Sequence, residues 1–126
     1  MNEPSCGNIP IEDGQFENKF LKPLYEEAIA AIRQVHPEAI GSVEPHILDM
    51  YTSKLTPFNV DQLVYAPHLY NSFSNTLWFD PLPEDVSFYI LLTIHQEKAK
   101  HLQMPLIMGE FGSPWRMHLF TLETWL

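Results

Sequence analysis

The sequence predicts an α/β fold in which short parallel strands are joined by crossover helices. Two stretches with apolar residues at helical spacing are separated by short, wholly apolar runs, which are typical of buried parallel strands. Crossovers of this kind are right-handed almost without exception. The 126 residues allow a single domain. The expected order along the chain is loop, helix, strand, loop, strand, helix, strand and helix.

The N-terminal part of the chain predicts a loop followed by a helix. Residues 1–15 contain two prolines and two glycines and show no periodicity, which indicates a loop. A main helix is expected from Pro23 to Val35, after a short lead-in turn, and Pro37 ends it. One apolar stripe predicts its buried side: Phe20, Leu21, Leu24, Ala28, Ile29, Ile32 and Val35.

Two strands are expected in the middle of the chain. The run from Ala39 to Val43 is apolar, too short for a helix, and ends at Glu44 and Pro45. Residues 46–61 predict a loop with at most one short helix around 47–53. The second strand, residues 63–66, leads into an exit loop that carries His68 and Tyr70, and a loop is expected to continue over residues 71–83.

A second helix and a third strand complete the pattern. Glu84 and Asp85 open the helix, and Lys98, Lys100 and His101 close it, which suits both ends of the helix dipole. One side of this helix carries Val86, Tyr89, Ile90, Thr93, Ile94, Glu97 and His101, and Leu91, Leu92 and Lys98 lie around the rest, so the helix is expected to be well buried. The third strand, residues 105–108, stops before Gly109 and Glu110, and residues 113–126 predict the start of another helix.

Charge and composition exclude several classes of function. Seven basic residues against 16 acidic ones give a net charge of -9, which repels phosphate backbones and anionic lipids. Nucleic acid and membrane surfaces are therefore not expected as partners, and no run approaches the ~20 apolar residues of a membrane span. The single cysteine, Cys6, excludes an internal disulfide. The six histidines show no metal-ligand spacing, so we expect neither a metal nor another cofactor.

Functional side chains follow each predicted strand. Glu44 follows the first strand, His68 and Tyr70 follow the second, and Glu110 follows the third. Ligands in parallel α/β folds gather at the carboxyl ends of strands, so these side chains are expected to lie close together. A further carboxylate, Glu3, stands in an Asn-Glu-Pro tripeptide near the chain start.

Three motifs, in this order and separation, resemble glycoside hydrolase family 5. They are Asn2-Glu3-Pro4, Pro67-His68-Leu69-Tyr70 and Gly109-Glu110-Phe111-Gly112, and they look most like the endoglycoceramidase-type branch. The resemblance implies a TIM (β/α)₈ barrel of typically ~250 residues. This chain would supply roughly its C-terminal half, from the end of strand four to the start of helix seven. Residues 1–126 would then be one incomplete catalytic domain.

The resemblance also implies roles for individual residues. Glu3 would be the general acid/base and Glu110 the nucleophile of a retaining glycosidase. Tyr70 is expected to donate a hydrogen bond to Glu110, and Asn2 to bond a sugar 2-hydroxyl. His68 would either orient the acid/base or bind sugar. The complete set of expected substrate-binding residues is Asn2, Glu44, His68, Tyr70, Trp78 and Trp115, with Phe79 as a further aromatic candidate. For Glu44, capping of the following turn is an equal alternative.

The sequence is compatible with more than one substrate and with either an active or an inactive protein. The expected substrate is a β-glucoside, with a glycosphingolipid among the candidates. A non-catalytic fragment or pseudoenzyme, inactive without the missing half-barrel, is the alternative. The missing half would also leave strand edges unpaired, and these edges could bind a complementary half or a second copy of the chain. An unrelated α/β binding protein would require Glu3 and Glu110 to lie far apart. The start of the chain lacks the signal-peptide pattern, although the family is often secreted, so localisation stays open.

Overall fold

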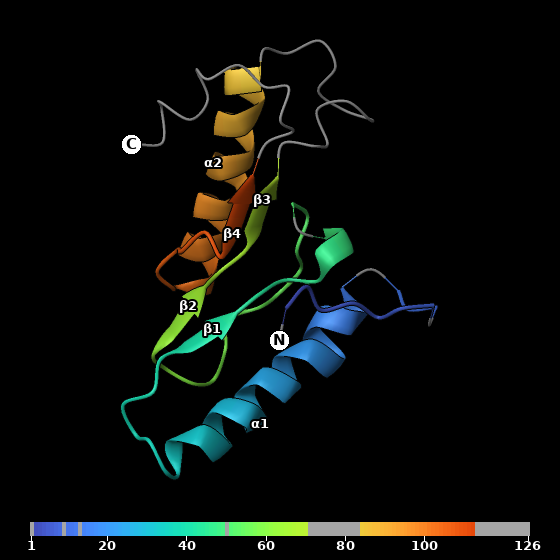
Figure 1. Ribbon diagram of the computed structural model, residues 1–126. Coiled ribbons are helices and arrows are strands. Elements are labelled where there is room, and N and C mark those ends of the chain that lie inside the picture. Colours follow the sequence, from blue (N-terminus) through green and yellow to red (C-terminus); the bar gives the residue numbers. More distant parts are fainter. Residues whose placement is uncertain (1, 9, 13, 50, 71–83, 113–126) are drawn as a thin grey trace.

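The computed structural model describes residues 2–8, 10–12, 14–49, 51–70 and 84–112 (Figure 1). The predicted loop with Trp78 and Phe79 lies outside these residues. The predicted C-terminal helix with Trp115 lies outside them as well. Among the described residues, no helix combines the length and the apolar character needed to cross a membrane.

The first helix is longer than expected and begins irregularly. A π-helical segment, Phe16–Leu21, continues without a break into α1, Lys22–Arg33. Pro23 lies in the first turn of α1, where a proline is well tolerated. The expected lead-in turn is therefore helical, and the expected bounds of the main helix differ by one residue at the start and two at the end.

The predicted apolar stripe of this helix is only partly buried. Leu21 and Ile29 are buried, together with Tyr25, which the stripe did not include, and they pack against Val43 and Leu63. The other large members of the stripe are exposed, by 46% to 87%: Phe20, Leu24, Ile32 and Val35. The prediction of one buried stripe was thus wrong for these four residues. The apolar arc of α1 is wider than the face that contacts the strands.

In the part of the chain that the structure describes, four short strands form two parallel pairs. β1 (Gly41–Val43) pairs with β2 (Leu63–Tyr65), and β3 (His68–Tyr70) pairs with β4 (Glu110–Gly112). One parallel bridge, between Tyr65 and Leu106, connects the segments that carry these pairs. Figure 1 shows α1 along the β1 and β2 pair and α2 along the β3 and β4 pair. The predicted α/β class with parallel strands is therefore confirmed.

The candidate residues lie within strands rather than after them. His68 and Tyr70 belong to β3, and Glu110 begins β4, so the expected exit loop after Ala66 is wrong. Pro67 carries no N–H group and suggested the end of a strand. The pairing nevertheless resumes at His68, and Leu106 is the member of the predicted third strand that forms the isolated bridge.

Gly109 is an extra residue in the last strand segment. Tyr65 pairs with Leu106, and the Gly109 N–H donates to the Pro67 carbonyl at 3.0 Å. Continuation of this register would place Gly109 opposite His68, but His68 pairs with Glu110. Such a β-bulge moves the following side chain to the opposite face of the sheet. The bulge therefore brings Glu110 to the face of His68.

α2, Glu84–Leu102, matches the predicted start and nearly the predicted end. Its buried side chains are Phe88, Leu91, His95, Ala99 and Leu102, so the helix is less completely buried than expected. These residues pack toward Tyr65 and Leu69, whereas Val86 and Tyr89 are 39% and 56% exposed. Thr93, Glu97 and His101 are exposed as well. The expectation of a well-buried helix was therefore wrong for the exposed side: apolar residues occur all around the helix, whereas one face of it packs on the strands.

Candidate active site

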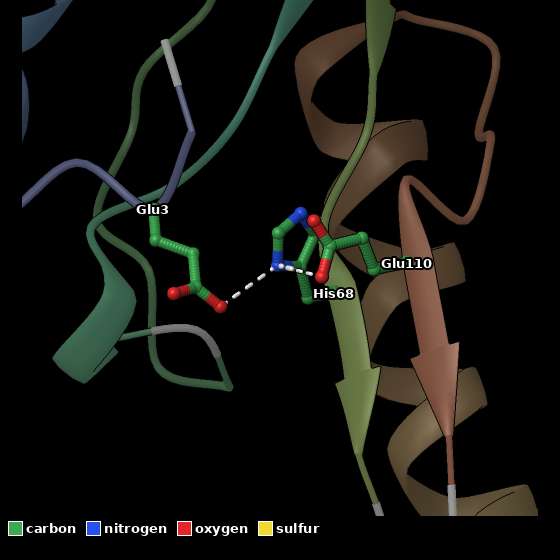
Figure 2. Close-up of side chains that lie close together, drawn as sticks. All are labelled: Glu3, His68 and Glu110. Carbon is green, nitrogen blue, oxygen red and sulfur yellow. Dashed lines mark hydrogen bonds and ion pairs between the residues drawn. The ribbon is translucent and has the colours of Figure 1, made fainter.

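The side chains of Glu3, His68 and Glu110 meet at one point of the molecule (Figure 2). His68 Nδ1 lies at hydrogen-bond distance from Glu3 Oε1, 3.1 Å, and 3.7 Å from Glu110 Oε2. One atom from each of the three residues lies within 4.8 Å of the other two. The N-terminal segment supplies Glu3, β3 supplies His68 and β4 supplies Glu110. The predicted convergence of the two glutamates and the histidine is thus found.

Burial differs sharply between the imidazole and the carboxylates. The His68 side chain is 3% exposed, whereas the side chains of Glu3 and Glu110 are 41% and 43% exposed. The second ring nitrogen of His68, Nε2, lies 3.6 Å from Glu44 Oε2. A buried ring therefore has carboxylates facing both of its nitrogens. This burial favours the orienting role expected for His68 over direct contact with sugar.

Tyr70 makes the contact that the sequence predicted for it. Its hydroxyl donates to Glu110 Oε2 at 2.7 Å, and this hydrogen bond raises the pKa of Tyr70 because the carboxylate accepts the phenolic proton. Gly112 pairs with Tyr70, and a Cβ on Gly112 would lie 2.8 Å from Tyr70 Cε1. Gly112, two residues after Glu110, therefore leaves room for the Tyr70 ring.

The N-terminal segment is fastened to the residues that follow β1. The Glu3 N–H donates to Glu44 Oε2 at 2.8 Å, and the Ile47 N–H donates to the Pro4 carbonyl at 3.0 Å. Glu3 has a φ of +47°, in the left-handed region that costs a side-chain-bearing residue energy. Strained backbone of this kind persists only where surrounding contacts hold it. Glu3 thus has a defined support in the loop after β1.

Glu44 has a role that neither prediction for it anticipated. Both expected roles, turn capping and sugar binding, overlooked its contact with the Glu3 backbone and its position beside His68. Glu44 is itself held by Tyr25, whose hydroxyl accepts from the Glu44 N–H at 3.2 Å and donates to the Glu44 carbonyl at 3.3 Å. Burial raises the pKa of Tyr25 to about 12. The only signal for Tyr25 was its position four residues from both Leu21 and Ile29.

A second carboxylate that the sequence did not reveal supports the same loop. Glu17 is fully buried and accepts hydrogen bonds from the His46 N–H at 3.1 Å and from the Ser53 hydroxyl at 2.9 Å. It also accepts one from the Lys54 N–H. These contacts compensate for the burial of a charge. No motif or spacing marked Glu17, because its partners lie 29 or more residues away.

The remaining predicted residues are less informative. Asn2 is exposed beside Glu3, and Trp78 and Trp115 lie outside the described residues. The proximity of Glu3 and Glu110 excludes the alternative of an unrelated binding protein, which required them to be far apart. The same two residues and His68 are also the described group that could hold a metal ion.

A family model matches most of the chain. The model described as Cellulase (glycosyl hydrolase family 5) matches residues 1–118, which includes all three motifs. The comparisons with curated proteins and with solved structures found no match. The family resemblance is thereby confirmed, without a decision between branches. The chain belongs to glycosyl hydrolase family 5, the cellulase family of glycoside hydrolases.

Proposed function

We propose that this chain carries the catalytic pair of a retaining glycoside hydrolase, with Glu3 as acid/base and Glu110 as nucleophile. The separation of the two carboxylates carries the proposal, since their facing oxygens lie within 4.8 Å of one another. Retaining enzymes hold their carboxyl groups about 5 to 5.5 Å apart, whereas inverting enzymes need about 6.5 to 9.5 Å to admit a water. The short separation therefore favours double displacement.

The hydrogen bonds at the site suit the two roles. Tyr70 donates to Glu110, which stabilises the ionised form that attacks the anomeric carbon. Glu3 first gives its proton to the leaving oxygen and then accepts one from the water that releases the sugar. His68 orients Glu3 through their 3.1 Å hydrogen bond. The exposed Asn2 is the candidate for contact with a sugar 2-hydroxyl.

The described strands fit a segment of a (β/α)₈ barrel. β1, the β2 and β3 segment, and β4 would be strands five, six and seven, and α2 would be helix six. Two observations support this placement. Among the described residues β1 pairs only with β2, which leaves an edge that a closed barrel would cover. The exposed apolar residues of α1 also suit a helix that has a further neighbour. A complementary half-barrel is the partner that would satisfy both surfaces.

The proposed substrate is a β-glucoside. The resemblance of the three motifs to the endoglycoceramidase-type branch favours a glycosphingolipid within this class. Trp78, Phe79 and Trp115 would then stack on sugar or line an apolar slot for the lipid. Glucans and mannans are the competing substrates, because the same pair of glutamates can cleave them.

A non-catalytic fragment is the second candidate, and the exposure of the site favours it. The carboxylates of Glu3 and Glu110 are more than 40% exposed, whereas catalytic electrostatics are strongest where water is excluded. On this alternative, the chain binds sugar weakly and does not turn it over.

Turnover by the purified chain separates the two candidates. The substrates are an aryl β-glucoside and a fluorescent glucosylceramide-type lipid, and the variant is Glu110→Gln. The matched control is Glu27→Gln, which removes the same charge from an exposed position of α1. Turnover that Glu110→Gln abolishes and Glu27→Gln preserves supports the hydrolase. A folded chain that cleaves neither substrate supports the fragment.

A further inference from the structure

Three candidate metal ligands lie within 4.8 Å of one another. They are Glu3 Oε1, His68 Nδ1 and Glu110 Oε2, and each comes from a different segment of the chain. Bonds of about 2.0 to 2.1 Å in a tetrahedral zinc site place neighbouring ligands about 3.3 Å apart. The observed distances from His68 Nδ1, 3.1 Å and 3.7 Å, lie on either side of this value. The partly exposed carboxylates of Glu3 and Glu110 can rotate to bring their oxygens to the spacing of a tetrahedral zinc site.

The surroundings of these ligands provide the outer contacts typical of metal sites. A metal-bound histidine usually presents its other ring nitrogen to a carboxylate, which fixes the ring. Nε2 of the buried His68 lies 3.6 Å from Glu44 Oε2, and the Glu44 side chain is 15% exposed. Tyr70 donates to Glu110, and the Glu3 N–H donates to Glu44. The side chains of His68 and Glu110 therefore each have a partner behind them, and the backbone of Glu3 is held by Glu44.

We propose that Glu3, His68 and Glu110 bind a divalent transition-metal ion, with Zn²⁺ as the expected occupant. One imidazole and two carboxylates suit Zn²⁺ or Co²⁺, whereas Mg²⁺ and Ca²⁺ prefer sites made only of oxygen. Three protein ligands leave the fourth position for water. We expected no metal because the histidines lack metal-ligand spacing along the sequence. Such spacing does not reveal a set of ligands that the fold assembles from positions 3, 68 and 110.

The ion would inhibit the proposed hydrolase, and this consequence rests on the proposed function. Zn²⁺ would engage the carboxylate that must attack the sugar and the one that must carry the proton. Metal and glycoside would therefore compete for the same side chains. Binding of the ion stands on the geometry alone and does not require the chain to be active.

Metal binding is tested on the full chain with Co²⁺ and Zn²⁺. We expect Co²⁺ to bind at one tight site, which the visible absorption spectrum of the bound ion reports. Stoichiometric Zn²⁺ should displace the Co²⁺, whereas excess Mg²⁺ should not. Glu3→Gln should weaken Zn²⁺ binding at least tenfold in calorimetry, and Glu44→Gln about tenfold through loss of the outer contact. The matched control Glu27→Gln should bind as the parent chain does.

His68→Asn should also weaken binding, with His36→Asn at an exposed position as its control. Because His68 is buried, circular dichroism must show that His68→Asn folds; if it does not, Glu3→Gln with its exposed side chain decides the question. A folded parent chain that binds no Zn²⁺, or a Glu3→Gln chain with undiminished affinity, overturns the proposal. Zn²⁺ binding without any hydrolysis supports the metal site while counting against the proposed function. Turnover unaffected by saturating Zn²⁺ overturns the competition.

Discussion

The hydrogen bond between Tyr70 and Glu110 depends on a glycine two residues beyond the glutamate. A side chain at Gly112 would meet the Tyr70 ring at 2.8 Å, and that ring places its hydroxyl 2.7 Å from Glu110 Oε2. On the other side, a Cβ at Gly109 would lie 2.8 Å from the Ala66 carbonyl oxygen. The Gly-Glu-Phe-Gly motif therefore has a packing reason at both glycines.

Tyr70→Phe is expected to lower kcat/KM on an aryl β-glucoside by roughly 10- to 100-fold. The variant loses a hydrogen bond to a charged group, an interaction with a typical contribution of about 1.5 to 3 kcal/mol. Steady-state kinetics measure the effect. The control is Tyr89→Phe, which removes an exposed hydroxyl on α2 and should leave the kinetics unchanged. Equal kinetics for the two variants would remove Tyr70 from the mechanism.

The sequence predicted the three residues that meet at the candidate site, but not the residues that hold them in place. Glu3, His68 and Glu110 were predictable because each stands in a recognisable motif of the family. Tyr25 and Glu17 act on the loop after β1 through contacts 19 or more residues away along the chain. No local pattern encodes such contacts, since they exist only once the helix has packed on the strands.

At the scale of elements, the ends of helices were easier to predict than their buried faces. Charged residues at both ends marked α2, and Pro23 marked the first turn of α1. The faces depend on the neighbours that each helix meets, and the apolar residues on several sides of α2 did not show which side is buried. The bulge at Gly109 could not be predicted either, because the register of a strand depends on the strand with which it pairs.

Glu17→Gln tests whether one buried carboxylate secures the loop after β1. We expect the free energy of unfolding to fall by about 1 to 3 kcal/mol, because the neutral amide replaces an oxygen acceptor with a donor among groups that already donate. Urea denaturation measures the change. Glu27→Gln, exposed on α1, should change stability by less than about 0.5 kcal/mol. A Glu17→Gln chain as stable as this control would contradict the role.

One buried histidine, His95, should make the stability of the whole molecule sensitive to acid. His95 is fully buried, and the centroid of its ring lies 5.3 Å from that of Tyr51 and 6.2 Å from that of Tyr65. Burial lowers the pKa of His95 to about 4, although the His68 backbone carbonyl opposes the shift. In the unfolded chain the ring titrates near its usual value of about 6.5. The unfolded state therefore binds more protons as the pH falls between these two values.

The free energy of unfolding should decrease by about 3 kcal/mol between pH 6.5 and pH 4 through His95 alone. Denaturant titrations across this range, compared with His95→Phe, isolate the contribution. The variant should lose this part of the pH dependence and keep an aromatic ring beside the two tyrosines. His101→Asn, at an exposed position of the same helix, should retain the full dependence. An unchanged slope in His95→Phe would show that another group is responsible.

The most direct test of the catalytic pair is covalent trapping of the nucleophile. A 2-deoxy-2-fluoro-β-glucoside with a good leaving group slows release of the glycosyl-enzyme, so a retaining enzyme accumulates the adduct. Mass spectrometry of the digested chain should locate the sugar on Glu110, with no label in Glu110→Gln. A folded chain that remains unlabelled, or one labelled at another residue, would contradict the assignment of Glu110.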